Sequence, residues 1–333
     1  MTPFEIGGQF VAPGTRETIN LEVSTLANAS RMNLPVHVVH GDKPGPVMFI
    51  SAVVHGDEIL GLEIVRRVIA HKALSAIAGT LLAVPIVNGF GFLNHSRYMP
   101  DRRDLNRSFP GSDHGSLASL LADLFFREIV QRAQFGIDLH SAALHRTNLP
   151  QIRIKSGDAD LMRLAESFAP PVILTSKLRD GSLRQSAADC GVKVLLYEGG
   201  EALRFEESAI ATGVAGTLRI MEAIGLTAAG SAPPATAAPV HSTSSIWARA
   251  PEGGILHSKR LVGDRVGRNE PIGIISDPLG TSTAPVFAED DGIIIGHTNL
   301  PIVNRGDALF HIARITSKAR AASAAMPDED EII

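Results

Sequence analysis

The sequence has very few cysteines, few aromatic residues and no long apolar run. Cys190 is the only cysteine among 333 residues, so an intrachain disulfide cannot form, and we expect a reducing, cytoplasmic setting. No stretch of about 18 uncharged apolar residues occurs, which argues against a membrane-spanning helix. Residues 1–10 lack the basic segment and following apolar run of a secretory signal peptide.

Neither sign of charge dominates the chain. Lys and Arg number 31 and Asp and Glu number 35, for a net charge of −4, which argues against nucleic acid or an anionic membrane as partner. Hydrophobic residues make up 44% and charged residues 20%, so the chain can bury a sizeable core. The length suits one large domain or two, and a homo-oligomer is compatible with it.

Short apolar runs alternate with helical patterns from Phe49 to Ile224. This alternation predicts an α/β catalytic domain over residues 1–226, built on a mixed, mostly parallel sheet flanked by helices. Two earlier segments, Thr18–Val23 and Val36–Val39, alternate with period two and should be antiparallel edge strands. Within the alternating region the expected strands are Pro46–Val54, Thr80–Val87, Phe135–Leu139, Gln151–Lys155, Val172–Thr175 and Val192–Tyr197, and the expected helices are Glu58–Ala70, Ser116–Gln131 and Glu206–Ala223.

The composition changes after residue 226. Residues 227–240 are mostly Ala, Gly, Pro and Ser, which indicates a linker. Residues 241–312 contain short β runs separated by Gly-Asp and Asp-Gly turns, which predicts a small all-β, barrel-like domain. Residues 313–333 are Ala-rich with an acidic end and should form a tail.

Two histidines and a glutamate follow predicted strands and are candidate metal ligands. His55 and Glu58 come directly after the strand that ends near Val54, and His140 ends the strand that begins at Phe135. Ligands in open α/β sheets bind beyond the carboxyl ends of strands, where these residues fall. Two imidazoles and one carboxylate are a known ligand set for one catalytic Zn²⁺ ion.

Further acidic side chains lie at the same strand ends. Asp138 and His140 are two residues apart on one strand, so Asp138 can accept a ring N–H from a ligand histidine. Glu198 follows the strand Val192–Tyr197 and is a candidate general base beside a zinc site. Glu201 is close enough in the sequence to be a rival for that role.

A polar loop around Asn106 and Arg107 contains several arginines. The arginine fork recognises carboxylates through two parallel hydrogen bonds, and the asparagine amide adds a directional contact. The loop therefore suits an anionic substrate, and Arg184 can supply another fork. The other interpretation is that Asn106 and Arg107 anchor the loop by an ion pair with Asp104.

Four short motifs, taken in order, resemble the succinylglutamate desuccinylase/aspartoacylase family within the zinc carboxypeptidase superfamily. The motifs span roughly Val47 to Gly200 and are His55-Gly56-Asp57-Glu58, Asp104-Leu105-Asn106-Arg107, Asp138-Leu139-His140 and Glu198 before a glycine pair. The resemblance implies a zinc-carboxypeptidase-like fold.

The resemblance also implies roles for these residues. His55, Glu58 and His140 would bind zinc, Glu198 would be the general base, and Asn106 and Arg107 would hold the substrate carboxylate, with Arg184 as a further substrate-binding arginine. An arginine followed by tyrosine polarises the scissile carbonyl in the family. Arg97-Tyr98 looks similar, although it lies further from Asp104, so Arg102 competes for this role.

The C-terminal β segments resemble a biotinyl/lipoyl-type barrel. Carrier domains of that shape present a lysine on a central hairpin. The corresponding hairpin here, Ser276–Thr283, contains no lysine, so we expect a wall over the active site or an oligomer contact instead of a swinging arm.

The sequence as a whole predicts a zinc-dependent hydrolase that cleaves the amide bond of a small, carboxylate-bearing N-acyl amino acid. N-acetyl-diaminobutyrate is one substrate of that type. A metallocarboxypeptidase that acts on peptides is the alternative among enzymes, and a non-catalytic binding module is the alternative from another class. The short catalytic part and the extra barrel favour a small substrate.

Overall fold

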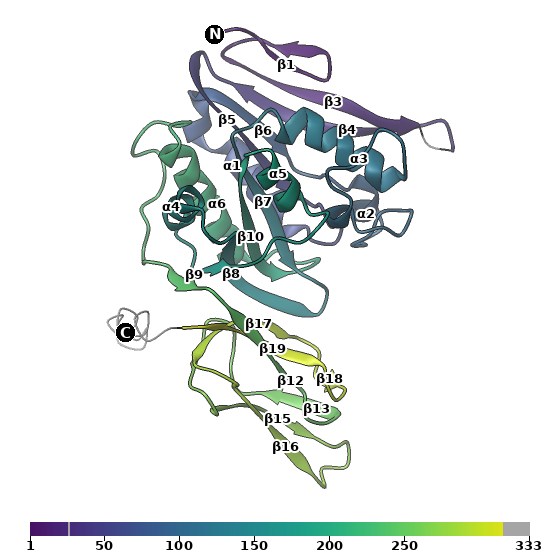
Figure 1. Cartoon of the computed structure of the whole chain (residues 1–333), viewed down its shortest axis with the longest axis vertical. Coiled ribbons are helices and arrows are strands. Elements are labelled where there is room, and N and C mark those ends of the chain that lie inside the picture. Colours follow the sequence, from purple (N-terminus) through teal and green to yellow (C-terminus); the bar gives the residue numbers. More distant parts are fainter. Residues whose placement is uncertain (26, 316–333) are drawn as a thin grey trace.

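The computed structural model describes residues 1–25 and 27–315, and its centre is a parallel sheet. β5 (Lys43–Ala52) pairs in parallel with β6 (Ala78–Val84) on one side and with β7 (Phe135–Ala142) on the other. β10 (Lys193–Glu201) pairs in parallel with β7. These four strands are among the six that the alternating pattern predicts, and they lie in the order β6-β5-β7-β10 (Figure 1).

Antiparallel strands extend the sheet on both sides, so the sheet is mixed. β3 (Thr15–Thr25) and β4 (Arg31–His40) form the predicted antiparallel edge, with β4 against β6. On the other side β8 (Arg146–Ile154) runs antiparallel to β10, and β9 (Val172–Thr175) runs parallel to β8. A short N-terminal hairpin, β1 (Phe4–Ile6) and β2 (Gln9–Val11), was not predicted.

Helices cover both faces of the central sheet, and the strand residues alternate between the two cores. Met48 and Ile50 on β5 face one core, with α1 (Leu60–Ala70), α4 (Ala159–Phe168) and α6 (Glu207–Ala223). Phe49 faces the other core, with α3 (Leu117–Phe125), its continuation Phe126–Val130 and α5 (Leu183–Asp189). Strands buried on both faces read as unbroken apolar runs, which is why they were visible in the sequence.

The helix predictions were incomplete. α1 begins at Leu60, so Glu58 precedes the helix and does not lie on it. The amphipathic helix at residues 116–131 divides into α3 and a π-helical turn. The short helices α2 (Gly89–Leu93), α4 and α5 and the 3₁₀ turns Lys72–Ser75 and Leu105–Arg107 were missed, because few residues contribute to each periodic pattern.

The C-terminal residues form the expected small β structure. A four-stranded antiparallel sheet contains β16 (Thr283–Phe287), β15 (Pro271–Ser276), β13 (Gly254–Ser258) and β18 (Ile302–Val303). β12 (Ser245–Arg249), β19 (Ala308–Arg314), β17 (Gly292–Thr298) and β14 (Arg265–Val266) pack against it around a core that includes Ile272, Leu309 and Phe310. The β15–β16 hairpin, whose turn has no lysine, is present as predicted.

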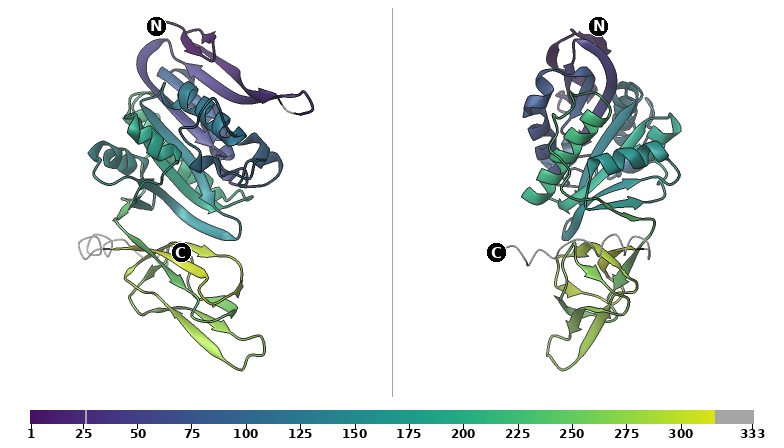
Figure 2. Two further views of the ribbon diagram at one scale, coloured as in Figure 1. Left: turned by 45° about the vertical axis from the view of Figure 1, so that its right-hand side comes forward. Right: turned by 90° about the vertical axis from the view of Figure 1, so that its left-hand side faces the viewer.

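The C-terminal strands also continue the central sheet, which the sequence did not indicate. β17 pairs antiparallel with β8, with Gly296 opposite Asn148, and β11 (Val240–Ser242), at the end of the expected linker, pairs in parallel with β9. The two parts are therefore joined edge to edge (Figure 2). β19 continues to Arg314, and residues 316–333 of the expected tail lie outside the described residues.

The α/β class, with a mixed helix-flanked sheet and a small C-terminal β part, is confirmed. In the described ranges, none of the helices combines the length and the apolar character needed to cross a lipid bilayer.

Candidate active site

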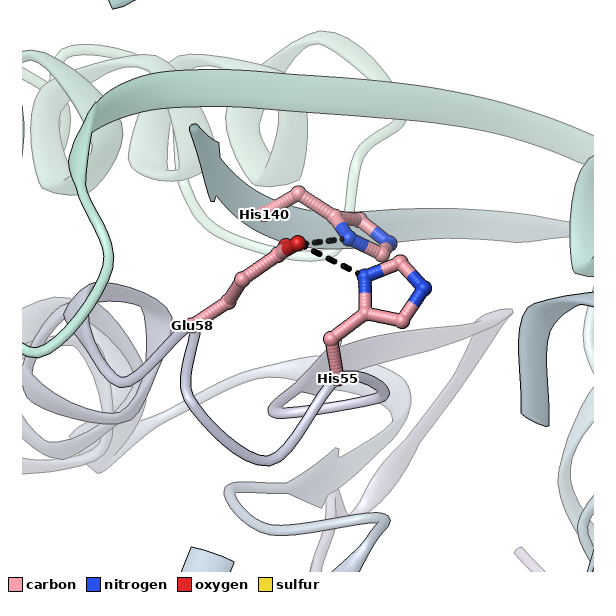
Figure 3. Close-up of side chains that lie close together, drawn as sticks. All are labelled: His55, Glu58 and His140. Carbon is pink, nitrogen blue, oxygen red and sulfur yellow. Dashed lines mark hydrogen bonds and ion pairs between the residues drawn. The ribbon is translucent and has the colours of Figure 1, made fainter. Parts of the chain in front are cut away.

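The three predicted metal ligands meet beyond the carboxyl ends of β5 and β7. His55 Nδ1 lies 2.7 Å from Glu58 Oε1, and His140 Nδ1 lies 2.7 Å from Glu58 Oε2 (Figure 3). All three side chains are buried. Adjacent parallel strands place their carboxyl ends at the same edge, and so residues 82 positions apart converge.

The turn that carries His55 and Glu58 depends on a glycine. A Cβ on Gly56 would lie 1.9 Å from the carbonyl carbon of Gly91, so no side chain fits between this turn and α2. Val53, the residue that follows β5, has a φ of 58°, a left-handed conformation that is unusual for a β-branched residue. Such strain occurs where the surrounding structure holds a functional turn in place.

Carboxylates orient both imidazoles. His140 Nε2 lies 2.8 Å from Asp138 Oδ2, the partner expected for Asp138, and Ser51 Oγ donates to Asp138 Oδ1 at 2.8 Å. His55 Nε2 lies 3.1 Å from Asp104 Oδ1, a contact that the sequence did not indicate. Each Nε2 has a carboxylate partner outside the cluster, so each Nδ1, which faces the shared Glu58, is the nitrogen that can bind a metal ion.

The three candidate ligand atoms fit one metal ion. Two imidazole nitrogens and one carboxylate oxygen lie within 4.8 Å of one another, and this donor set is typical of catalytic zinc. Burial by itself would raise the pKa of Glu58, but the two imidazoles outweigh it and hold that pKa well below its usual value. The glutamate therefore stays ionised, as a metal ligand must.

The structure separates the two candidates for the carbonyl-polarising arginine. Arg97 Nη1 donates to Glu58 Oε1 at 3.0 Å, and Arg97 Nη2 donates to Asp104 Oδ2 at 3.1 Å. Arg97 therefore lies beside the candidate metal ligands. Arg102 is exposed and does not line the cavity described below.

Glu198 lies on the same edge of the sheet as the candidate metal ligands. It is directly opposite His140 in the parallel β10–β7 register, so the two side chains project from the same face. Asn148 Nδ2 donates to Glu198 Oε2 at 2.9 Å, and Arg153 Nη1 lies 3.7 Å from Oε1. The rival Glu201 instead accepts hydrogen bonds from the His145 backbone N–H and from Asn299, outside the cavity.

The expected carboxylate clamp combines two distant segments. Asn106 Oδ1 accepts a hydrogen bond from Leu183 N at 2.9 Å, which leaves the amide N–H donors of Asn106 for a ligand. A Cβ on Gly181 would lie 2.5 Å from Arg107 O, so a glycine lets the two segments touch. The alternative ion pair between Arg107 and Asp104 does not form, since within the described ranges no carboxylate lies within 4.0 Å of the Arg107 guanidinium.

Arg184 is half-buried and has almost no hydrogen-bond partners. Its Nη1 atom is buried without a partner, and Nη2 lies 3.5 Å from Ser176 Oγ. Burial, together with repulsion from Arg153, lowers the pKa of Arg184 to about 10, so it is still a cation at neutral pH. A half-buried cation without a carboxylate partner in the described structure is suited to an anionic ligand.

A cavity of about 570 Å³ joins these groups. Eight of the nine predicted site residues line it, and the ninth, Asp138, contacts His140 from behind. The sequence did not indicate several other lining residues, because they become neighbours only in the folded chain. Strand pairing brings in Arg146, Asn148, Arg153, Ser245, Trp247 and His311, and a loop contributes Lys177 and Arg179.

Sequence comparison gives one family match and one similar curated protein. The succinylglutamate desuccinylase/aspartoacylase catalytic-domain model matches residues 44–224. An N-alpha-acetyl-L-2,4-diaminobutyric acid deacetylase from Halomonas elongata is 27% identical over 296 residues, covering 85% of this chain and 86% of the other protein.

Solved structures share the fold over most of the chain. A succinylglutamate desuccinylase/aspartoacylase from Rhodobacter sphaeroides superposes with a TM-score of 0.80 at 23% identity, covering 90% of this chain and 96% of the other. The product-bound ectoine utilization protein EutE (DoeB) from Ruegeria pomeroyi gives 0.78 at 20% identity, covering 91% and 95%. With the family match spanning more than half of its length, the chain belongs to the succinylglutamate desuccinylase/aspartoacylase family.

Proposed function

We propose that this protein is a zinc-dependent hydrolase that cleaves the amide bond of a small N-acyl amino acid. The observation that carries the proposal is the meeting of two imidazoles and a carboxylate, within 4.8 Å of one another, in a cavity that also contains Glu198. A metal ligand set with a nearby carboxylate that is free to move a proton is the arrangement that amide hydrolysis needs.

The chain's own residues divide the chemistry among them. His55, Glu58 and His140 would hold the zinc ion, which supplies Lewis acidity toward water and the amide carbonyl. Glu198 takes a proton from the attacking water and gives it to the nitrogen of the leaving amine. Arg97 places positive charge beside the oxygen that becomes negative in the transition state.

Substrate recognition is assigned to three other residues of the cavity lining. Asn106, Arg107 and Arg184 would bind the carboxylate of the amino acid, because all three line the cavity and keep donors without a carboxylate partner in the described structure. The names of the similar proteins, a diaminobutyric acid deacetylase and succinylglutamate desuccinylases, are consistent with an N-acyl amino acid as substrate.

The two alternative functions, a metallocarboxypeptidase and a non-catalytic binding module, have less support than the deacylase. A cavity of about 570 Å³ suits a small molecule, whereas a carboxypeptidase needs space for an extended peptide. A non-catalytic binding module would not need a carboxylate opposite His140 in addition to the ligand set. Assays with N-acyl amino acids and with C-terminal peptide substrates distinguish the two enzymes, and elemental analysis showing less than one zinc per chain would favour the binding module.

The test of the proposed function is the substitution Glu198→Gln. We expect kcat to fall about 100- to 10,000-fold, the range typical of a lost general acid–base group, while the zinc content stays at one ion per chain. Glu201→Gln is the matched control, since Glu201 lies on the same strand outside the cavity and should keep most of the activity. Full activity in Glu198→Gln, or activity that survives removal of the metal by a chelator, would contradict the proposal.

The expected cytoplasmic location and the possible homo-oligomer both stay predictions.

A further inference from the structure

The four-stranded C-terminal sheet has one face turned away from the core of the C-terminal part. Leu256 on β13, Ile275 on β15 and Val286 on β16 are buried in that core. Side chains alternate along a strand, so the residues between them project from the opposite face, which we call the outer face. β15 and β16 lie at the end of the molecule farthest from the N-terminal hairpin, and none of the described lining residues of the cavity belongs to the outer face (Figure 1).

The outer face is mostly apolar and carries no charged residue. Ladder partners form three rows on it, and six of their members are apolar: Ile255, Pro271, Ile274, Pro285, Phe287 and Ile302. The other members are His257, Ser276 and Thr283. Ile302 is 68% exposed and Phe287 is 47% exposed. Single exposed apolar side chains are common, whereas a contiguous group of them on one face marks an interaction surface.

The two edges of this sheet are poor sites for pairing with another strand. β18, at one edge, is only two residues long. β16, at the other edge, has Pro285 at its centre, and proline lacks the N–H group that a ladder needs. Proteins use short edge strands and prolines to prevent edge-to-edge association. A partner of this sheet would therefore contact its outer face.

Two charges without partners mark the opposite ends of β13. Glu252 lies two residues before the strand, Lys259 directly follows it, and both are exposed. Within residues 1–25 and 27–315, neither side chain makes an ion pair or a hydrogen bond. The outer face is thus flanked by an acidic residue at one end of β13 and by a basic residue at the other.

A second copy of this chain matches both features. An apolar face without charges is complementary to itself, and a two-fold contact brings the same patch of two identical chains together. Two identical sheets that meet face to face are related by an axis parallel to the sheets. If this axis runs across the strands, the two β13 strands are antiparallel and Glu252 of each copy lies near Lys259 of the other. If the axis runs along the strands, like charges meet and repel each other.

We propose that the outer face is the interface of a two-fold homodimer, in which the β13 strands are antiparallel and Glu252 of each copy pairs with Lys259 of the other. Four strands about 4.8 Å apart and about five residues long make a face of about 300 Å². A standard stable interface buries about 800 Å² on each partner, so this dimer should dissociate on dilution. The proposal concerns assembly and does not rest on the proposed function.

Sedimentation equilibrium of the full chain at low ionic strength tests the interface. We expect the average mass of the wild type to rise from one chain toward two between about 1 and 200 µM, a range suited to a small, reversible interface. Ile302→Glu and Phe287→Glu should each weaken association about tenfold or more, because each places a carboxylate in an apolar contact. Phe10→Glu is the matched control, since Phe10 is also 68% exposed but lies on β2, and it should associate like the wild type.

Two results would overturn the proposed interface. One is a wild type that keeps the mass of a single chain over the whole concentration range, and the other is wild-type association in both outer-face variants. Thermal unfolding checks that the variants are folded, and we expect wild-type midpoints because both substituted positions are exposed.

An exchange of charges tests the orientation of the two copies. Lys259→Glu and Glu252→Lys should each weaken association about 3- to 30-fold, because each replaces two attractions in the dimer by two repulsions. The double variant Lys259→Glu/Glu252→Lys should restore wild-type association, and about 0.5 M salt should remove the differences among all four proteins. A double variant that associates no better than the single variants would overturn the antiparallel arrangement.

Discussion

At the scale of single residues, His311 shows how a cavity wall rich in arginine affects a buried imidazole. His311 is 8% exposed, and its burial, reinforced by the nearby Arg153 and Arg146, lowers its pKa to about 3. The imidazole is therefore neutral throughout the physiological range. A neutral ring can stack on Trp247 without adding another positive charge to the wall.

The low pKa of His311 predicts a loss of stability in acid. The unfolded chain protonates this imidazole near pH 6.5 and the folded chain does not, so the unfolded state binds more protons and stability falls as the pH falls from about 6.5 toward 3. Between pH 7 and pH 5 the contribution is about 2 kcal/mol. Urea unfolding at both values should therefore show a smaller pH dependence for His311→Gln than for the wild type. The same pH dependence in both proteins would show that His311 titrates normally.

At the scale of secondary-structure elements, the contact between β7 and β5 depends on one glycine. A Cβ added to Gly136 would lie 2.2 Å from Cε1 of Phe49, a buried ring on β5. Phe49 in turn packs edge-on against Phe125 of α3, with ring centres 6.0 Å apart. The ring therefore has no room to withdraw, and the spacing of β5, β7 and α3 is set by the absence of a side chain.

Gly136→Ala should consequently destabilise the central sheet. We expect a loss of about 1–3 kcal/mol of unfolding free energy, the range for an overpacked core, measured as a lower midpoint in thermal and urea unfolding. Gly89→Ala is the control, because a Cβ there meets nothing within 4 Å. If both variants had the wild-type midpoint, Phe49 would have to be mobile in the core.

At the scale of the whole molecule, the C-terminal strands reach the candidate base through the seam between β17 and β8. Gly296 on β17 is opposite Asn148 on β8, and Asn148 Nδ2 donates to Glu198 Oε2. The C-terminal part thus supports the candidate catalytic carboxylate, although none of its described residues belongs to the candidate metal cluster.

Gly296→Ala tests this connection. The new Cβ would lie 2.7 Å from Asn148 Oδ1, and the amide should turn away from Glu198 because a side-chain end moves more easily than the backbone. We expect kcat to fall about tenfold, the size of one lost hydrogen bond to a charged group, with little change in the unfolding midpoint. Gly253→Ala, whose Cβ has no contact below 3.6 Å, should behave like the wild type. Unchanged kinetics in Gly296→Ala would show that Asn148 does not position Glu198.

Much of this architecture could be predicted from local sequence. The central strands were predictable because burial on both faces makes them continuous apolar runs, and His55, Glu58 and His140 were predictable because each follows such a run. Short helices such as α2 and α5 were not, because five to seven residues carry too little periodicity.

The sequence by itself determined the strand–helix order and which residues at strand ends are candidate metal ligands, because each of these signals lies within a few positions of its own strand. Only the tertiary structure decided that Asp104 would contact His55, that Arg97 and not Arg102 would lie beside Glu58, and that Trp247 and His311 would line the cavity. Pairing between β17 and β8 joins segments about 150 residues apart, and no local pattern encodes which edges meet.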